Sequence, residues 1–409
     1  MIYYFTSNGI GNAWVANELS VLQKAGIPFS LHAMRKPETS FHRADWAAKL
    51  NDSTVEIYPI SVSGMLGTIV SAPLIFGTRF FSALVNALFG TRENFRARAA
   101  CFVHFWVACH WARLHRHEPI SHVHSQWAHS CCSIAMYATW LLDKSFSFTG
   151  HGADLWRDRV ALDDKIQRAD FIACISNFHR ELYLKHGARP GQLHIVYCGI
   201  DTAQFAPPAE HEKPTDGPFR IRSSGRLVEK KGFPYLIEAC RILKDRNVPF
   251  ECTIGGSGPL ESELKSLVSK LHLTDHVTIT GRAIKQEDIA AFAHSGTVYC
   301  LPCVWASDND ADGLPQMLME NMACGLPAIS TRLVGIPDLI LDGETGLLVD
   351  PNNAEQIADA VQKIAADPAL AKRLAENGRQ HILDHFQLEP ALQPLIKYYR
   401  KQLAKAAKG

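Results

Sequence analysis

Short apolar runs that end in a glycine or polar turn recur along the whole chain. Residues 2–6 form the first run, which breaks at Ser7-Asn-Gly-Ile-Gly11 and leads into a helical pattern over residues 13–24. A buried strand, a glycine turn and a helix are the opening unit of a doubly wound parallel sheet, because a crossover helix has to separate parallel strands. The turn lacks the G-x-G-x-x-G spacing of dinucleotide-binding folds, so a nicotinamide cofactor is not indicated.

The same alternation continues through both halves of the chain. With 409 residues, 47% of them hydrophobic and 20% charged, there is material for two globular domains. Residues 206–218 hold four prolines without periodicity and are expected to be a linker. We therefore predict doubly wound Rossmann-like α/β domains over residues 1–205 and 219–385, followed by a helical tail over 386–409. Further strands are expected at residues 27–33, 55–60, 145–149, 170–176, 193–197, 219–223, 250–255, 277–280, 298–301 and 327–330.

The charge balance argues against a nucleic-acid partner. The formal net charge is +1, with 19 Lys/Arg against 15 Asp/Glu in residues 1–205 and 23 against 26 in the remainder. The cysteines number 11, an odd count without a disulfide-like framework, which favours a reducing compartment. No signal-peptide pattern is seen at the first residues, so a cytoplasmic location is expected.

Two carboxylates, Asp312 and Glu320, lie eight positions apart around a Gly-Leu-Pro corner. Pro315 suits the first turn of a helix that runs to about residue 324, where Gly325 ends it. A helix start offers free N–H groups and the positive end of the helix dipole, and both attract phosphate. The plainer alternative is that Asp312 only caps the helix and that Glu320 is solvated on its outer face.

Two cations follow the strand expected at residues 219–223. Gly225 permits a turn, Arg226 offers a planar fork to phosphate oxygens, and Lys231 adds a mobile point charge. Cations at the carboxyl end of a strand are poorly explained by stability alone. The pattern therefore indicates binding of a diphosphate.

These stretches resemble the motifs of the retaining, nucleotide-sugar-dependent glycosyltransferases, family 4-like, of the exopolysaccharide or colanic-acid type. The D/E-x7-E signature falls on Asp312 and Glu320, and the G-R-L-x-x-x-K-G pattern falls on residues 225–232. The T-x-H-x-x-D element falls on residues 149–154 and includes His151. The resemblance implies the GT-B fold, in which two doubly wound domains face a central cleft and the C-terminal helix crosses back to the first domain.

The resemblance also implies roles for particular residues. Glu320 would hold the ribose hydroxyls of the donor, Asp312 would lie beside the donor sugar, and His151 would reach the sugar or the reacting centre. Arg226, Lys231 and the helix start near Leu314 would stabilise the leaving diphosphate in place of a metal. The implied catalytic residues are His151, Arg226, Lys231 and Asp312, and the implied donor-binding residues are Gly9, Gly11, Gly225, Arg226, Lys231, Gly281, Leu314 and Glu320.

No metal site and no obligate cofactor are expected. His122, His124 and His129 have no carboxylate nearby, which weighs against zinc, and the pair His122 and His124 is expected to line the cleft. Asp308-Asn-Asp310 is only a weak imitation of a metal-binding D-x-D pair.

The function that follows is retaining transfer of a hexose-type sugar from a UDP- or GDP-sugar to a hydroxyl of a saccharide or lipid-linked saccharide acceptor. Synthesis of a bacterial cell-surface polysaccharide or glycolipid is the expected setting. Alternatives are a nucleotide-sugar epimerase of the same architecture, a phosphorylase and a non-catalytic sugar-binding protein. The base, the donor sugar, the acceptor, the linkage and the oligomeric state are not indicated by the sequence.

An apolar stretch in the first half has two interpretations. Residues 57–78 lack charge, but Pro59, Pro73 and three glycines argue against a transmembrane helix. Apolar residues then repeat at helical spacing from residue 80, and three arginines follow, at positions 92, 96 and 98. Residues 80–98 are either core-facing helix or a peripheral contact with the inner face of the cell membrane.

Overall fold

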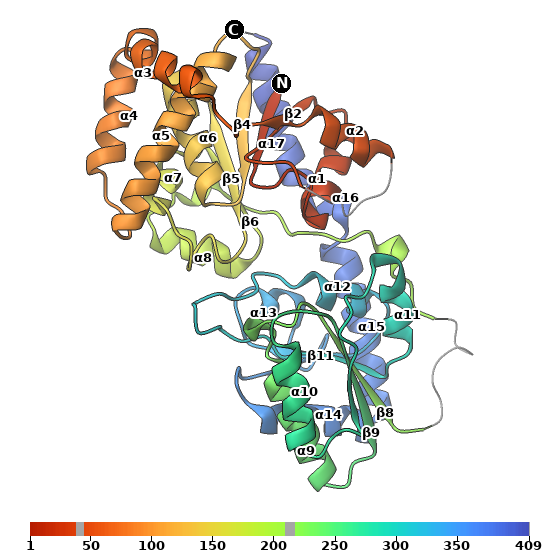
Figure 1. Cartoon of the computed structure of the whole chain (residues 1–409). Coiled ribbons are helices and arrows are strands. Elements are labelled where there is room, and N and C mark those ends of the chain that lie inside the picture. Colours follow the sequence, from red (N-terminus) through yellow and green to blue (C-terminus); the bar gives the residue numbers. More distant parts are fainter. Residues whose placement is uncertain (38–44, 209–216, 409) are drawn as a thin grey trace. The chain divides into compact units, whose positions relative to one another are not determined.

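The computed structural model describes residues 1–37, 45–208 and 217–408, and the chain divides into two compact units. The first unit comprises Met1–Tyr197 with Leu392–Gly409, and the second comprises Cys198–Ala391 (Figure 1). Most of the expected linker, residues 206–218, lies outside the described residues.

The first unit is built on a seven-stranded parallel sheet in the order β3-β2-β1-β4-β5-β6-β7. Ile2 of β1 pairs with Phe29 on one side and with His122 on the other, so the strand order reverses at β1. This is the doubly wound arrangement that the alternating pattern predicted. The strands are β1 (Ile2–Thr6), β2 (Phe29–Ala33), β3 (Val55–Glu56), β4 (His122–Gln126), β5 (Phe146–Gly150), β6 (Phe171–Cys174) and β7 (Leu193–Ile195).

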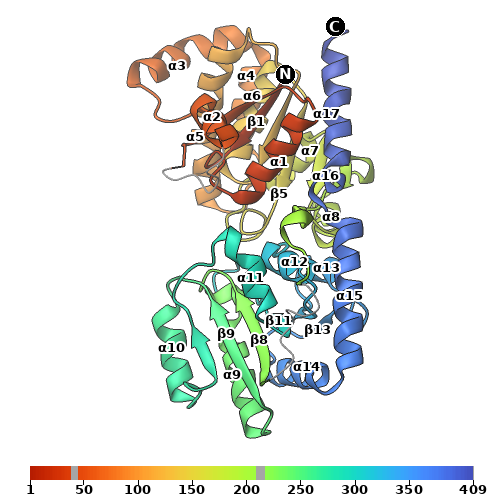
Figure 2. The ribbon, with the colours of Figure 1, turned by 90° about the vertical axis from the view of Figure 1, so that its right-hand side faces the viewer.

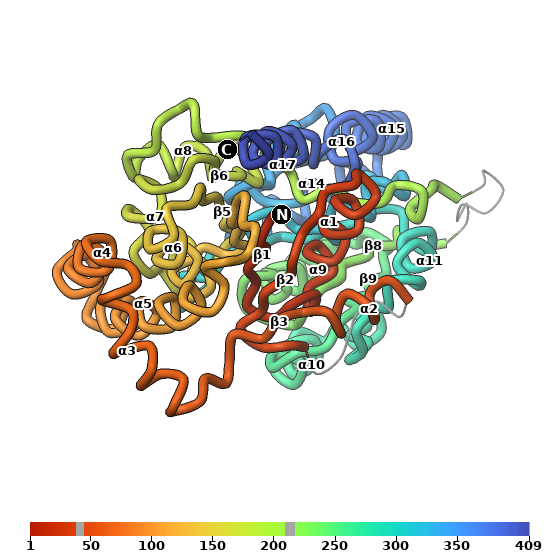
Figure 3. Tube along the Cα trace, turned by 90° about the horizontal axis from the view of Figure 1, so that it is seen from above, coloured from red at the N-terminus to blue at the C-terminus, as the bar shows by residue number. Residues whose placement is uncertain are grey.

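Helices cover both faces of this sheet, so its central strands are buried on both sides. Figure 3 shows α5 and α6 on one side of β1, and α1 and α17 on the other. Helices α6 and α17 both contact β4. Two further helices, α3 and α4, pack on the outside of α5. The helices are α1 (Ala13–Lys24), α2 (Asp45–Ser53), α3 (Val62–Phe76), α4 (Thr78–Phe89), α5 (Phe95–His115), α6 (Ser130–Leu142), α7 (Leu162–Arg168), α8 (Asn177–Lys185) and α17 (Gln393–Ala406).

Helix α3 was not anticipated from the sequence. Pro73 lies inside it, where proline cannot donate a hydrogen bond to the preceding turn, but the helix continues to Phe76. None of the helices within the described residues is by itself long and apolar enough to cross a bilayer. Only α3 and α4 taken together pass that test, and they are bent by 119° at their junction.

The C-terminal helix packs in the first unit, as expected for the fold resembled. Figure 2 shows the tail in blue, with α17 alongside the first sheet. Tyr398 and Tyr399 of α17 pack their rings against His122, and Tyr399 also contacts His124. The predicted return of the tail is therefore confirmed.

The expectation that His122 and His124 line a cleft is wrong. Both side chains are fully buried in β4, where they exchange hydrogen bonds with Ser145 and Ser147 on and beside β5. Burial lowers the pKa of His122 to about 3, so the ring is neutral in the fold. The strand position was correct, but α17 covers this face, and α17 comes from the far end of the sequence.

The second unit has a six-stranded parallel sheet in the order β10-β9-β8-β11-β12-β13. Its strands are β8 (Phe219–Ser224), β9 (Phe250–Gly255), β10 (Val277–Ile279), β11 (Val298–Leu301), β12 (Ala328–Thr331) and β13 (Leu347–Val349). Its helices are α9 (Phe233–Asp245), α10 (Glu261–Lys270), α11 (Ile289–His294), α12 (Gln316–Ala323), α13 (Ile336–Leu339), α14 (Ala354–Ala366), α15 (Pro368–His385) and α16 (Leu388–Ala391).

Gly232 closes the turn between β8 and α9 and admits no side chain. Its φ is +68°, and an added Cβ would lie 1.8 Å from the carbonyl oxygen of Pro302. Gly343 has a similar φ of +76° but open space around it. Substitution of these two glycines by alanine therefore distinguishes two destabilising effects. At Gly343 only the backbone conformation is unfavourable, whereas at Gly232 the new side chain also clashes.

We predict that Gly343→Ala lowers the free energy of unfolding by about 1 kcal/mol, the usual cost of a left-handed residue. Gly232→Ala should cost about 1–3 kcal/mol more, because backbone at Pro302 has to move. Urea denaturation of both variants measures the difference. If both variants lose the same free energy of unfolding, the loop at Pro302 moves aside without a measurable loss of stability.

Candidate functional site

Polar loops gather at the carboxyl edge of the second sheet. In a parallel sheet all strands end at the same edge, so the segments after β8, β9 and β11 lie near one another. Gly225 N–H donates to Gly255 O at 2.9 Å, which joins the first two of these segments. The segment after β11 then runs to α12 and carries both carboxylates of the sequence motif.

Lys231 and Asp312 form the centre of this edge. Lys231 Nζ lies 2.5 Å from Asp312 Oδ2, and Lys230 Nζ lies 3.2 Å from Asp312 Oδ1. Lys230 also contacts Asp310 Oδ2 at 3.0 Å. Two lysines from the segment after β8 therefore hold two aspartates from the segment after β11.

The ion pairs decide the charge state of Asp312. Burial by itself would raise the pKa of Asp312, but Lys231 and Lys230 outweigh burial and lower it. Burial would likewise lower the pKa of Lys231, yet Asp312 raises it. Both groups are consequently ionised near neutral pH, and each depends on the other for its charge.

Arg226 is a cation of this edge that no described acid compensates. Its side chain is exposed and makes no hydrogen bond or ion pair with a described residue. Gly225 precedes it with a φ of +152°, and a Cβ there would lie 3.2 Å from Cε of Lys231. Glycine thus leaves room for the Lys231 stem beside Arg226.

Glu320 lies inside α12 and is almost completely buried. Gln286 Nε2 donates to its Oε1 at 3.1 Å, whereas its Oε2 has no partner among the described residues. Burial raises the pKa of Glu320 to about 7. A buried carboxylate oxygen without a donor is costly, so this atom is suited to a hydroxyl donor from a ligand.

The remaining expected donor-site residues of this unit are turn residues. Leu314 and Pro315 directly precede α12, and Gly335 N–H fixes that corner by donating to Gly313 O at 3.0 Å. Gly281 follows β10 with a φ of +65°, beside the carboxylate of Glu261.

His151, Gly9 and Gly11 lie in the first unit, at the carboxyl ends of β5 and β1. Gly9 has a φ of +47°, and Gly11 N–H closes the turn by donating to Asn8 O at 2.8 Å. His151 Nε2 lies 2.7 Å from Gln126 Oε1, and its ring packs against Trp14 with the ring centroids 3.9 Å apart and the planes tilted by 38°. Burial lowers its pKa well below 6.5, so the ring is neutral.

Gln126 connects His151 to a buried acid. Its amide nitrogen donates to Glu18 Oε2 at 2.8 Å, and Tyr4 donates to Glu18 Oε1. Since that nitrogen faces Glu18, the amide oxygen faces His151 and requires the proton of His151 on Nε2. Burial raises the pKa of Glu18 to about 7. The network fixes the tautomer and the orientation of His151.

The structure thus brings Gly225, Lys231 and Asp312 into one cluster, and it places Glu320 on the helix that follows. Sequence reasoning missed the contributions of Lys230, Asp310 and Gln286. The Lys230-Lys231 doublet and the spacing of Asp310 from Asp312 were visible in the sequence. Nothing in the sequence pointed to Gln286, because it reaches Glu320 from a different loop.

Two family models match the chain in the order of its two halves. Residues 77–204 match "Glycosyltransferase Family 4", and residues 208–381 match "Glycosyl transferases group 1". Together the matched ranges cover most of the chain.

Individual proteins agree with these matches. A putative colanic acid biosynthesis glycosyltransferase of Escherichia coli is 36% identical over 49% of this chain and 48% of its own length. A GDP-mannose-dependent alpha-(1-6)-phosphatidylinositol monomannoside mannosyltransferase of Mycolicibacterium smegmatis is 31% identical over 56% of this chain and 62% of its own length. The chain spans about half of the length of the curated relatives that it matches first.

A solved structure from Anabaena, HepE in complex with UDP, superposes with a TM-score of 0.72. It covers 98% of this chain and 99% of the other at 13% identity, a likeness that shows the fold alone. The two doubly wound units and the returning C-terminal helix are the GT-B fold.

Proposed function

We propose, from its membership of the group 1 glycosyl transferases, that this chain transfers a sugar from a nucleoside diphosphate donor to an acceptor hydroxyl. The observation that carries the proposal is the Lys231–Asp312 pair with Arg226 beside it at the carboxyl edge of the second sheet. Cations held at a strand end, next to a helix start, suit a diphosphate group.

The pair also suggests how the donor is received. Lys231 is neutralised by Asp312 when no ligand is bound, and Arg226 is the exposed charge that an incoming diphosphate meets first. The phosphate oxygens would then share Lys231 with Asp312. Charge that develops on the leaving diphosphate would be stabilised by Arg226, Lys231 and the first turn of α12, without a metal ion.

Glu320 is proposed to hold the ribose of the donor. Its Oε2 is buried without a donor, and a ribose hydroxyl can supply one. His151, held by Gln126 in the first unit, is proposed to contact the donor sugar. The sugar is proposed to be a hexose carried on uridine or guanosine diphosphate and transferred with retention, as in the family resembled.

The acceptor is proposed to be a saccharide or lipid-linked saccharide of a cell-surface polysaccharide or glycolipid. The relatives named above act, by their names, in colanic acid biosynthesis and on a phosphatidylinositol mannoside. Both family models are of glycosyltransferases, so neither supports the epimerase alternative.

We further propose that the first unit docks on the inner face of the cell membrane. Helices α3 and α4 each expose an apolar stripe at helical spacing, including Leu74 at 84% and Phe89 at 76% exposure. Residues 57–117 contain six arginines and a single acid, Glu93, a bias that favours an anionic surface. An apolar face with this charge bias fits anionic lipid better than a second copy of the chain.

One part of the sequence interpretation of residues 80–98 needs correction. Arg92 is not available to lipid, because its side chain is fully buried and pairs with Asp164 at 2.7 Å. Arg98 donates to the carbonyl of Leu88, so of the three arginines it is Arg96 that remains exposed without such a contact. Phe80 is buried in the core, whereas Phe81 and Val85 are exposed.

The transfer assay tests the proposal directly. With a UDP- or GDP-sugar and a suitable saccharide acceptor, we expect a new glycosidic bond and one free nucleoside diphosphate per bond. The rate should persist in excess EDTA, because cations of the chain occupy the place of a metal. Loss of activity that only magnesium or manganese restores would overturn the metal-independent mechanism.

Substitution of the two acids should separate their roles. Glu320→Gln should chiefly raise the donor KM, by about ten- to a hundredfold, the worth of one charge-assisted hydrogen bond. Asp312→Asn should lower kcat more than it raises KM, since contacts to the transferred sugar strengthen in the transition state. Glu238→Gln, at an exposed position on α9, serves as control.

The pH dependence adds a second test of Glu320. Its pKa of about 7 means that the carboxylate is protonated, and a weaker acceptor, at lower pH. The donor KM of the wild type should therefore rise as pH falls below 7, and that of Glu320→Gln should not. Parallel profiles would exclude Glu320 as the ribose partner.

Membrane docking is tested by co-sedimentation with vesicles of phosphatidylcholine and phosphatidylglycerol. We expect the wild type to sediment at low salt, and Leu74→Asp combined with Phe89→Asp to remain in solution. Leu341→Asp, at an exposed leucine of the second unit, should behave as the wild type. A wild type that stays in solution at low salt would contradict the docking proposal.

A further inference from the structure

The first unit contains a pocket of about 760 Å³ that the expected site residues do not account for. It lies at the carboxyl edge of the first sheet, where ligands of doubly wound folds bind. Its walls come from the segments after β1, β2, β3, β4 and β5 and from the start of α5. The charged residues of the lining are Arg35, Arg96, Arg157, Arg159 and Asp158, with His129 beside them.

The pocket is strongly cationic. Asp158 is the single acid among the described residues that line it, and it is paired with Arg157 at 2.7 Å. Arg35 and Arg96 are exposed and make no hydrogen bond or ion pair with a described residue. Arg159 donates to Leu155 O at 2.7 Å and has no carboxylate partner among the described residues. The starts of α5 and α6, which carry Arg96 and Ser130, add the positive ends of two helix dipoles.

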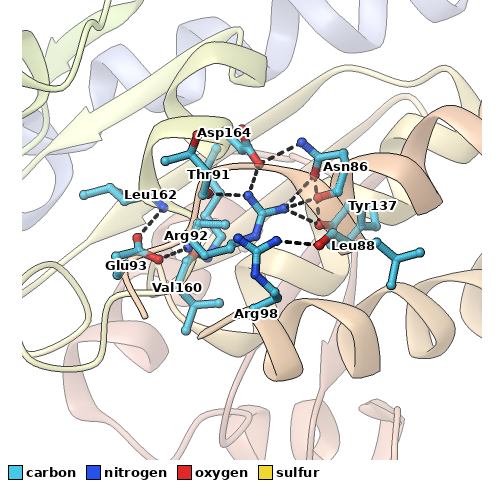
Figure 4. Close-up of polar contacts among 12 residues, drawn as sticks. Asn86, Leu88, Thr91, Arg92, Glu93, Arg98, Tyr137, Val160, Leu162 and Asp164 are labelled. Atoms are coloured by element: carbon cyan, nitrogen blue, oxygen red, sulfur yellow. Dashed lines mark hydrogen bonds and ion pairs between the residues drawn. The ribbon is translucent and has the colours of Figure 1, made fainter. Parts of the chain in front are cut away.

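Charged groups outside the lining hold the walls of the pocket together. Arg92 and Glu93 directly precede α5, and Figure 4 shows both bound to the segment that follows Arg159. Arg92 bonds Asp164, and Glu93 accepts from the N–H groups of Ala161 and Leu162 at 2.9 and 3.0 Å. The wall that carries Arg96 is thereby fixed to the wall that carries Arg157 and Arg159.

Lys165 fixes the third wall. Its side chain is completely buried, and its ammonium group donates to Val160 O, to Ala128 O at 2.6 Å and to His129 O at 3.1 Å. Burial of the Lys165 and Arg92 side chains costs free energy, because their charges lose water. The walls that they hold in place bring the arginines of the pocket close together, and these like charges repel one another. Such a pocket gains stability when an anion enters.

An exposed aromatic side chain lies between two residues that line the pocket. Asn94 and Arg96 line the pocket, and Phe95 between them is 83% exposed. A phosphate in the pocket would therefore place a lipid chain attached to it beside Phe95 and α4.

We propose that this arginine pocket binds the phosphate group of a lipid-borne acceptor. The inference rests on the proposed transferase function and names the chemistry of its acceptor. Arg35, Arg96 and Arg159 contact the phosphate oxygens, and the lipid chain leaves the pocket toward the membrane that α3 and α4 touch. Ser7 and His129, which also line the pocket, face the saccharide side of the head group.

The test uses the full chain and dihexanoyl phosphatidic acid below its micelle concentration, with binding measured by calorimetry. We expect Arg35→Gln combined with Arg96→Gln to weaken binding by about tenfold or more, the loss expected for charge-assisted bonds. Arg79→Gln combined with Arg116→Gln removes the same charge from exposed positions outside the pocket and should bind like the wild type. Melting curves confirm that both double variants are folded.

If the wild type and both double variants bind the lipid with equal affinity, the pocket is not its binding site, because only diffuse electrostatic attraction would remain. If inorganic phosphate binds as tightly as the lipid and competes with it, the proposal that the pocket recognises a lipid-borne acceptor is wrong. Nucleotide-sugar binding is measured on the same proteins by thermal stabilisation. Its absence in the wild type would refute the proposed function, whereas its presence with equal lipid affinities would refute only the pocket.

Discussion

The parallel strand direction is the constraint on which both units depend. Parallel strands need a crossover after each strand, so both faces of each sheet are covered by helices and every strand ends at the same edge. Apolar side chains fill the interior, and the polar loops collect at the carboxyl edge. In the second unit this edge holds Lys231, Asp312 and Arg226, and in the first it holds the arginine pocket.

The two edges use charge in different ways. In the second unit, Lys231 and Asp312 compensate each other, so the phosphate of the proposed donor would exchange for part of an existing ion pair. In the first unit, Arg92, Glu93 and Lys165 have structural roles, because each is bound to backbone groups or to a fixed side chain. Of the arginines that line the pocket, Arg35 and Arg96 have no acid partner among the described residues. One arrangement suits a ligand that is released after each turnover, and the other suits recognition by a preformed surface.

Sequence patterns predicted the fold better than they predicted side-chain environments. The strands, the parallel sheets and the returning C-terminal helix follow from local periodicity and from the family resemblance, and the structure has them. The roles of Arg92 and of the pair His122 and His124 were misjudged. Each of these side chains is buried by a segment distant in sequence, α7 in one case and α17 in the other. The helix α3 was missed because Pro73 was taken as a break, whereas the helix continues past it to Phe76.

What the sequence by itself determined is the set of short-range features. It determined where strands end, where glycine permits a turn, and which cations and carboxylates stand at those ends, because these depend on residues within a few positions of one another. The tertiary structure alone decided which of those groups meet. Lys230 with Asp310, Gln286 with Glu320, and Gln126 with Glu18 are pairs across separate loops or helices. Their charge states follow from burial and from those partners, which exist only once the sheets have brought distant segments to a common edge.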